Sequence, residues 1–216
     1  MATSAGLTRG DVFLDVVECA SAGKSWVKAT EGNVVKIAVV GKGNVGGGLA
    51  DRWERAGHDV TRIGKDGGNV SDAEAVVVAV PGGAISDVFD TVSGWEGKTV
   101  VDATNLIGAE PPGGFSSNAE FVKSKTNGPT AKAFNLNFAR LYDEIDATRS
   151  RPSNIWSGDE EARGVVEQLT RDAGYEPVYA GGMDKTATQE QGIGLIFAIS
   201  QASGPFVYRM APPDKL

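Results

Sequence analysis

Val34-Val-Lys-Ile-Ala-Val-Val-Gly-Lys-Gly-Asn-Val-Gly46 is the stretch of this sequence that decides the fold. Its first seven residues are almost all apolar, which is typical of a strand buried in a parallel sheet. The glycine spacing GxGxxG follows directly, and apolar residues at helical intervals continue to Ala56. In this context Gly41 permits a tight turn, Gly43 admits a pyrophosphate, and Gly46 allows close packing of helix on strand. The stretch therefore predicts a phosphate-binding turn, with an empty flexible turn as the alternative.

The chain beyond this stretch alternates short apolar runs with amphipathic segments, the pattern of parallel strands joined by crossover helices. Only eleven residues, 64 to 74, separate the second apolar run from the third, and three of them are glycines. A crossover needs about ten to twelve residues, so this connection is barely long enough, and its glycines disfavour a full helix. The usual third strand is therefore expected to be short or missing. The pattern predicts an α/β fold with a Rossmann-like, doubly wound, mostly parallel sheet, in which the next strands are 58–63, 75–80 and 99–102.

The second half of the chain adds further C-terminal strands and helices to this sheet. It starts with a loop at 108–117, rich in glycine and proline, that bridges elements or covers a ligand. No break requires a second domain, so residues 34–216 are predicted to form one Rossmann-like domain. Residues 1–33 carry no assigned chemistry and are hypothesised to be a dispensable extension. The further predicted elements are strands at 131–134, 154–156 and 177–179 and helices at 159–173 and 185–202.

Composition and charge exclude several classes of function. The chain has 216 residues, one cysteine, one histidine and a net charge of −7. A metal site or a Cys-His nucleophile needs several such groups, and a nucleic-acid-binding protein normally carries a basic stripe, so neither is expected. The longest apolar run, 193–200, is shorter than the roughly 18 residues of a membrane-spanning helix. The N-terminal segment does not resemble a secretory signal, so a cytoplasmic protein is expected.

Two basic residues near the end of the second strand indicate which dinucleotide is bound. Arg62 and Lys65 lie about 20 residues past the glycine motif, where basic residues accommodate the extra phosphate of NADP and an acidic residue holds the ribose of NAD. Asp59 lies at the wrong end of the strand and Asp66 lies beyond the turn, so NADP is favoured. The alternative is that Arg62 and Lys65 are ordinary solvated charges.

The nicotinamide ring is expected at the carboxyl ends of the third and fourth apolar runs. Val80 and Pro81 end one run before a pair of glycines, so this loop offers a flat ring close access. Thr104 and Asn105 end the next run and offer polar groups to the carboxamide or the substrate, although such residues are equally common in ordinary turns. The predicted cofactor-binding residues are Gly41, Lys42, Gly43, Asn44, Val45, Gly46, Arg62, Lys65, Val80, Pro81, Thr104 and Asn105.

No acid/base pair stands out in the sequence. Lys132 and Asn135 are the best catalytic candidates across the cleft, although a lysine at a strand edge is usually just solvated. His58 opens the second strand, far from the ligand edge, and is expected to be structural. Hydride transfer between two bound molecules needs aligned reactants and excluded water rather than a general base, so a sequence without such a base is compatible with it.

Four segments of the chain resemble the NADPH:coenzyme F-420 oxidoreductase family in sequence, spacing and order: 36–46, 75–81, 100–105 and 131–135. The resemblance extends from residue 34 to about residue 182. It implies a Rossmann-like domain, NADP(H) binding and hydride transfer to a deazaflavin or another acceptor. It also implies that the adenosine phosphate is held by Lys65, the pyrophosphate by Gly41, Gly43, Asn44, Val45 and Gly46, and the nicotinamide side by Val80, Pro81 and Asn105.

The chain departs from the family pattern in three ways, one of which is that the helix that usually follows Gly64-Lys65 is truncated. Gly64-Lys65 stands where the family often has Ser-Arg, which keeps the charge but loses the guanidinium fork that grips a phosphate in two places. Ala187 stands where the C-terminal motif would carry an arginine, although Glu190 remains. These departures bear on deazaflavin use more than on NADP use.

The sequence therefore predicts an NADP(H)-dependent oxidoreductase that transfers hydride between the nicotinamide and coenzyme F-420 or a small organic acceptor. The alternative is a module that binds or senses NADP(H) without turnover. A third reading is a structural interaction protein that uses the apolar segment 193–199 as a dimer contact, although burial in the core is the commoner fate of such a segment. The expected partners are a small-molecule acceptor and, in a homodimer, a second copy of the chain, with neither nucleic acid nor a membrane.

Overall fold

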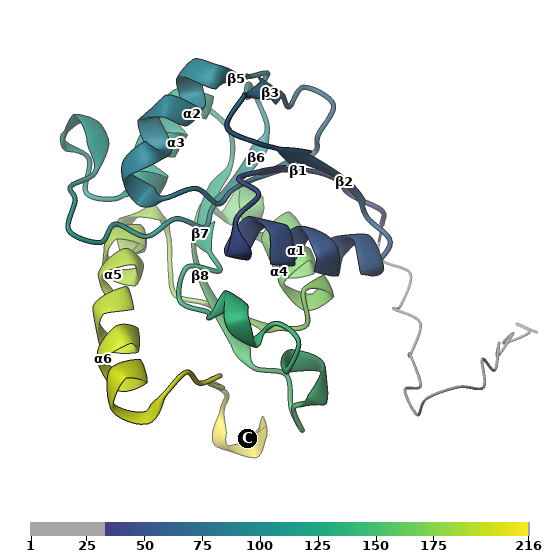
Figure 1. Cartoon of the computed structure of the whole chain (residues 1–216), viewed down its shortest axis with the longest axis vertical. Helices are drawn as coiled ribbons and strands as arrows, with labels where there is room; N and C mark the ends of the chain where they lie inside the picture. Colours follow the sequence, from purple (N-terminus) through teal and green to yellow (C-terminus); the bar gives the residue numbers. More distant parts are fainter. Residues whose placement is uncertain (1–32, 216) are drawn as a thin grey trace, which may run out of the picture.

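The computed structural model describes residues 33–215, so the hypothesis that residues 1–33 are dispensable lies almost wholly outside the described residues. The core is a seven-stranded sheet in the order β2-β1-β4-β6-β7-β8-β9 (Figure 1). Every neighbouring pair is parallel except β7 with β8. The predicted doubly wound, mostly parallel α/β fold is therefore confirmed. The strands are β1 Lys36–Val40, β2 Asp59–Ile63, β4 Ala75–Val78, β6 Thr99–Asp102, β7 Thr130–Ala133, β8 Ser153–Gly158 and β9 Glu176–Tyr179.

The third strand of the usual order is missing from this sheet, as the short crossover predicts. After β2 the chain forms only the two-residue strand β3 (Gly68–Asn69), which pairs with β5 (Val92–Ser93) in a separate small sheet. The chain then enters β4 on the other side of β1. Because β1 lies between β2 and β4, its carboxyl end is the topological switch point at which ligands bind in open α/β sheets.

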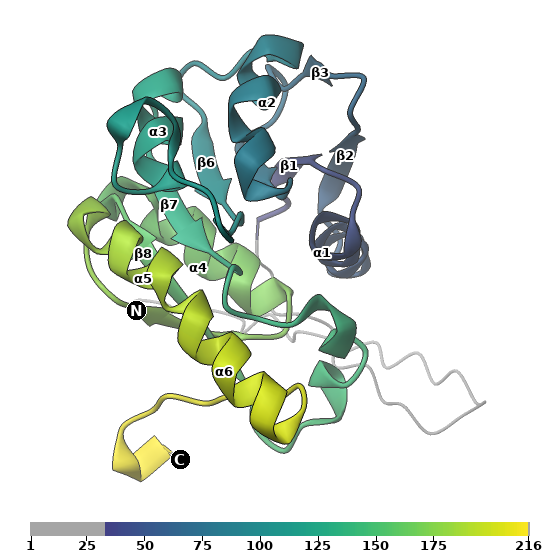
Figure 2. The same cartoon turned by 60° about the vertical axis from the view of Figure 1, so that its left-hand side comes forward.

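Helices cover both faces of the sheet, because the buried side chains alternate along the central strands. Ile37 and Val39 of β1 pack on the face covered by α1 and α4, whereas Ala38 and Val40 pack on the face covered by α2 and α3. Figures 1 and 2 show these two helical layers with the sheet between them. The helices are α1 Asn44–Arg55, α2 Ile85–Thr91, α3 Asn118–Thr126, α4 Arg163–Asp172, α5 Thr186–Gln191 and α6 Ile193–Ser203.

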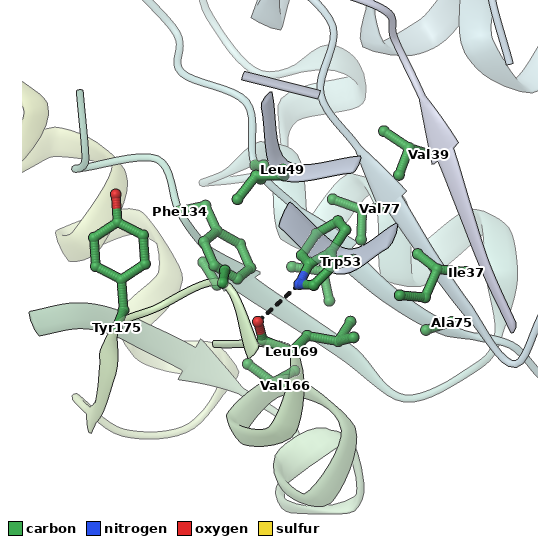
Figure 3. Packing of buried hydrophobic residues seen from close by; sticks show 14 of the residues in the cluster. Ile37, Val39, Leu49, Trp53, Ala75, Val77, Phe134, Val166, Leu169 and Tyr175 are labelled. Carbon is green, nitrogen blue, oxygen red and sulfur yellow. Dashed lines mark hydrogen bonds between the residues drawn. The ribbon is translucent and has the colours of Figure 1, made fainter. Parts of the chain in front are cut away.

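Trp53 connects α1 to α4 and to the residue that follows β7, on the face of the sheet that α1 and α4 cover. Its side chain is fully buried, and its ring N–H donates a hydrogen bond of 2.8 Å to the carbonyl oxygen of Leu169 in α4 (Figure 3). Its ring meets the ring of Phe134 edge-on, with 5.7 Å between the centroids. Since Phe134 directly follows β7, this contact fixes the carboxyl end of β7 against the helix that begins at the glycine turn.

One helix lies where the sequence reading predicts no element. The hydroxyl of Ser117 caps α3 by accepting a hydrogen bond of 3.2 Å from the backbone N–H of Glu120. The serine and the glutamate three residues later match the capping-box pattern, which marks a helix start. This pattern is the feature of the sequence that indicates α3. The last predicted helix, 185–202, is instead two consecutive helices, α5 and α6, that meet at Gly192 (Figure 2).

Helix α6 is apolar and yet largely exposed. Leu195, Phe197 and Ile199 are 67%, 37% and 40% exposed, and only Ile193 of this helix is buried. Burial of segment 193–199 in the core is therefore a wrong expectation, and the predicted homodimer stays a prediction. Within residues 33–215, no helix has both the length and the apolar character needed to cross a membrane.

Candidate functional site

The three motif glycines of the turn after β1 differ in what the protein requires of them. Gly41 has a φ of 114°, and a Cβ there would lie 2.2 Å from the carbonyl oxygen of Ala79. A Cβ at Gly46 would lie 2.0 Å from the carbonyl oxygen of Gly41. A Cβ at Gly43, by contrast, would meet no described atom within 4 Å. The fold itself thus demands glycine at positions 41 and 46, whereas position 43 faces open space that a ligand can enter.

Helix α1 begins directly after this open position. Gly43 is its N-cap residue, and among the described residues no side chain caps the helix and no acidic side chain lies in its first turn. Lys42, Gly43 and Asn44 are exposed, and Val45 is half-buried. Free backbone N–H groups and the positive end of the helix dipole are therefore available to an anion, which is how dinucleotide-binding turns hold a pyrophosphate.

The carboxyl end of β2 lies beside this turn, because the N–H of Gly41 donates a hydrogen bond of 2.9 Å to the carbonyl oxygen of Ile63. The side chain of Lys42 lies over Gly64, where an added Cβ would be 3.5 Å from the lysine Nζ. Lys65 follows in an exposed turn. The structure thus brings two lysines to the place where the sequence predicts the adenosine phosphate.

Arg62, the other predicted phosphate ligand, already has partners. Its guanidinium lies 2.7 Å from both Asp51 Oδ1 and Glu54 Oε2 of α1. The hydrogen bonds that Arg62 donates to Asp51 and Glu54 raise its pKa above the ordinary value. A bound phosphate would have to compete with two carboxylates for this guanidinium, so the role predicted for Arg62 stays a prediction and Lys42 is the better placed cation.

The two loops predicted to face the nicotinamide lie against each other. A Cβ at Gly82 would lie 2.2 Å from the carbonyl oxygen of Asn105, so the loop after β4 packs directly on the loop after β6. The side-chain amide of Asn118 donates to the carbonyl oxygen of Gly82 at 3.1 Å and to the hydroxyl of Thr104 at 2.8 Å. Pro81 is exposed, whereas the Thr104 side chain is buried. Pro81 is thus accessible to a ligand, while the Thr104 hydroxyl holds the two loops together.

Lys132 is not the solvated edge lysine that strand-edge statistics favour, because its side chain is fully buried. Its Nζ lies 2.8 Å from Asp102 Oδ2, donates to the carbonyl oxygen of Thr104 at 3.0 Å, and lies 3.3 Å from Glu190 Oε1. The N–H of Thr104 in turn donates to Asp102 Oδ1 at 2.9 Å. This enclosed cation supports the loop after β6 from below, so its placement favours a positioning role over direct contact with substrate.

Asn135 lies next to a residue in an unusual backbone conformation. Phe134 has a φ of 63°, which is rare for a bulky side chain, and its N–H donates to Asn154 Oδ1 at 2.9 Å. The Asn135 amide donates to Asn105 Oδ1 at 3.0 Å, and the Asn105 amide donates to the carbonyl oxygen of Asn135 at 2.7 Å. Gln189 of α5 donates to Asn135 Oδ1 at 2.8 Å. Strained backbone of this kind occurs preferentially at functional sites.

A cavity of about 450 Å³ opens beside this network, between the loop after β6 and helices α5 and α6. This volume lies in the range of small-ligand pockets. Glu190 lines the cavity although its side chain is almost completely buried, and its Oε2 accepts a hydrogen bond of 3.0 Å from the N–H of Asn118. Burial raises the pKa of Glu190, and the nearby Lys132 ammonium partly opposes this rise. Ala187, where the family resemblance implies an arginine, contributes only a methyl group to the same wall.

The predicted residues are therefore spread along one edge of the sheet, at the carboxyl ends of β1, β2, β4, β6 and β7. Two contributions were missed by sequence reasoning, namely Asn118 and Gln189, and Glu190 entered only through the family resemblance. His58 is structural, as expected, since its Nδ1 accepts from the N–H of Val35 at 3.1 Å and its Nε2 lies 2.9 Å from Asp172.

Solved structures share this architecture. A proposed F420-dependent NADP-reductase from Arthrobacter sp. FB24 matches with a TM-score of 0.68 and 21% identity, over 82% of this chain and 100% of that one. An imine reductase from Pseudomonas sp. matches with a TM-score of 0.59 and 16% identity, over 79% of this chain and 64% of that one. A 3-hydroxyisobutyrate dehydrogenase from Mycobacterium tuberculosis matches with a TM-score of 0.55 and 13% identity, over 79% of this chain and 62% of that one.

These likenesses bear on the fold. The family resemblance seen in the sequence is matched by a structural similarity to a protein described in the same terms, and the Rossmann-like architecture is confirmed. The dehydrogenase and the imine reductase are longer, and the chain spans under two thirds of each. No protein-family model and no curated protein matches this chain.

Proposed function

We propose that this protein is an NADP(H)-dependent oxidoreductase that transfers hydride between the nicotinamide and a second molecule bound in the adjoining cavity. The observation that carries the proposal is the open position at Gly43, which the fold leaves free while it closes the space at Gly41 and Gly46. An uncapped helix start lies at the same place, and both features suit a pyrophosphate.

The residues around this position fit the rest of the cofactor. The backbone from Gly43 to Gly46 would hold the pyrophosphate, and Lys42 with Lys65 would hold the phosphate that distinguishes NADP from NAD. The loop formed by half-buried Val80 and exposed Pro81 would receive the nicotinamide end. The roles of the glycine turn, Lys65 and the Val80–Pro81 loop agree with those that the family resemblance implies, whereas the role of Lys42 rests on its position over Gly64.

Bound NADPH would supply the hydride, so the chain's own task is to bind, orient and exclude water. Asn118 and Thr104 clamp the loops after β4 and β6 together, and Lys132 fixes the Thr104 carbonyl from the buried side. Asn105 and Asn135 join the loops that follow β6 and β7 through reciprocal hydrogen bonds. Lys132 and Asn135 are positioning residues in this account, and no residue is assigned as a general base.

The acceptor is proposed to be coenzyme F-420 or a small organic molecule. The resemblance to F-420-dependent reductases supports the first, and the compact cavity beside Asn105 supports the second. A cytoplasmic location is part of the proposal.

The test has two stages. Calorimetric titration of the full chain with NADPH and NADH should show micromolar NADPH binding and much weaker NADH binding. NADPH oxidation is then followed with F-420 and with small carbonyl and imine compounds. Binding without oxidation of NADPH by any acceptor would favour a non-catalytic NADP(H)-binding module, and binding of neither dinucleotide would contradict the proposal.

A further inference from the structure

The cavity beside the strand ends has an unbalanced charge. Its walls combine apolar side chains, among them Leu106, Pro111 and Phe197, with the neutral polar side chains of Ser116 and Gln191. Glu110 and Glu190 are the charged side chains that line it, and the described lining contains no lysine, arginine or histidine. Glu110 is exposed at the rim, whereas Glu190 is buried. A ligand in this cavity therefore meets apolar surface and negative charge.

The imbalance continues beneath the cavity. Lys132 is the cation nearest to Glu190 in the buried cluster, and it already pairs with Asp102 at 2.8 Å. Glu190 Oε1 lies farther from the same ammonium, at 3.3 Å, and accepts no hydrogen bond from the described residues. Two carboxylates thus share one ammonium, and ionised Glu190 gives the cluster a formal charge of −1. Buried charge without a full counter-charge is costly, so a cation in the cavity would stabilise this arrangement.

We propose that the cavity binds a small organic cation, with Glu190 as its counter-ion and the apolar wall around its carbon skeleton. A protonated imine and the amine formed from it are the substrate and product of this class. This inference rests on the proposed function, which it narrows by assigning the acceptor's charge.

The cavity chemistry disfavours anionic acceptors. A carboxylate or phosphate placed here would lie near Glu190 and Glu110, with no described cation on the wall to receive it. Coenzyme F-420 carries phosphate and carboxylate groups, so its tail would have to leave the cavity. Arginine at position 187 would supply the missing counter-charge, and Ala187 does not.

A protonated imine also suits a site without a general acid. Reduction by NADPH is balanced as it stands: the imine carbon gains a hydride, the C=N π pair becomes the nitrogen lone pair, and NADPH becomes NADP⁺. The chain then needs only to hold the cation, and in this proposal the negative charge of Glu190 does so from the cavity wall. Burial raises the pKa of Glu190, and an adjacent organic cation would favour its ionised form.

Three probes with the same ring and different charges test whether the cavity prefers a cation, a neutral molecule or an anion. The full chain, saturated with NADP⁺, is titrated calorimetrically with cyclohexylammonium, cyclohexanol and cyclohexanecarboxylate. The ammonium should bind at least about tenfold more tightly than the alcohol, and the carboxylate should not bind. Equal binding of ammonium and alcohol, or preferential binding of the carboxylate, would overturn the inference.

Two substitutions test the counter-ion. Glu190→Gln should remove the preference for ammonium over alcohol, whereas Glu110→Gln at the exposed rim should change it by no more than about threefold. If Glu190→Gln does not fold, Ala187→Arg provides the second test, because it adds a cation to the wall without changing the buried cluster. It should weaken ammonium binding and strengthen carboxylate binding, and an unchanged order of the three probes would contradict the inference.

NADPH binding, measured in the same samples, keeps the two proposals apart. NADPH binding without any preference among the probes would overturn the cation site alone. Ammonium binding without NADPH binding would overturn the proposed function and leave the cation site in place.

Discussion

The glycine turn after β1 and the buried polar network at the ends of β6 and β7 contribute to one site in opposite ways. In the turn, Gly41 and Gly46 meet atoms close to them in the chain or in the adjoining loop after β4. In the network, Lys132 contacts Asp102 and Glu190, which are 30 residues before it and 58 residues after it in the sequence. The turn is one continuous stretch of sequence that packs on Ala79, whereas the network takes its side chains from the ends of β6 and β7 and from α3 and α5.

The two regions are stabilised in different ways. The turn depends on backbone geometry and on the absence of side chains, so a single methyl group can disturb it. The network depends on two buried carboxylates that share the Lys132 ammonium, so removing that ammonium affects both of them. Substitutions in the two regions should therefore have different sizes and different readouts.

The largest expected effect is in the network. Lys132→Met removes the only described ammonium from between two buried carboxylates and should lower the free energy of unfolding by about 3–5 kcal/mol in a urea titration. Lys123→Met is the control, because the Lys123–Asp159 pair is partly exposed and should cost about 1 kcal/mol or less. Equal losses in the two variants would mean that burial of the charge cluster is not what stabilises this end of the sheet.

A somewhat smaller loss is expected in the turn. Gly41→Ala places a Cβ 2.2 Å from a carbonyl oxygen at a φ of 114° and should lower the free energy of unfolding by about 3 kcal/mol. The measurement is again a urea titration. A cost below about 1 kcal/mol would show that the turn relaxes easily, and the contrast with the network would then be sharper than proposed.

Cofactor specificity should change by a smaller amount still. Lys42→Ala and Lys65→Ala should each weaken NADPH binding about tenfold, the value of one charge-assisted hydrogen bond, and should leave NADH binding nearly unchanged. Arg62→Ala should change NADPH affinity less, since its guanidinium already pairs with Asp51 and Glu54. Calorimetry with both dinucleotides checks all three variants, and a loss confined to Arg62→Ala would reverse the assignment.

The smallest expected effect is a pH dependence of stability. The pKa of Glu190 is raised in the folded protein because of its burial, so the folded chain holds this proton more tightly than the unfolded chain does. The resulting stabilisation is present at low pH and is lost as the pH rises from the ordinary glutamate range through the raised pKa. Urea titrations across this range should show wild type losing stability relative to Glu190→Gln. Parallel pH profiles would mean that Glu190 titrates as an exposed glutamate does.

The same contrast explains what the sequence could predict. The strand, turn and helix around Gly41 to Gly46 follow from local patterns. So does the missing third strand, because an eleven-residue connection is barely long enough for a crossover and its three glycines disfavour a helix. Lys132 looks like an edge lysine in the sequence, since nothing near it in the chain announces Asp102 or Glu190. Asn118 and Gln189 carry no local signal of function, although the Ser117 capping pattern marks the helix that positions Asn118.

Helix α6 shows a different limit of the sequence. An apolar segment such as 193–199 is usually buried in the core. In the structure α5 packs against β7 and β8, whereas α6 continues beyond the sheet and leaves Leu195 exposed (Figure 2). Burial depends on where the chain leaves the sheet, which residue composition does not encode.

The central claim is that the open position at Gly43 receives a dinucleotide, and Gly43→Ala tests it most directly. The protein has room for this methyl group and needs no positive φ there, so the melting temperature should stay within about 3 °C of wild type. Gly164→Ala, at a helix position that is equally open, is the matched control. NADPH affinity should fall at least about tenfold in Gly43→Ala and stay unchanged in Gly164→Ala. Unchanged NADPH affinity in both variants, with both folded, would contradict the central claim.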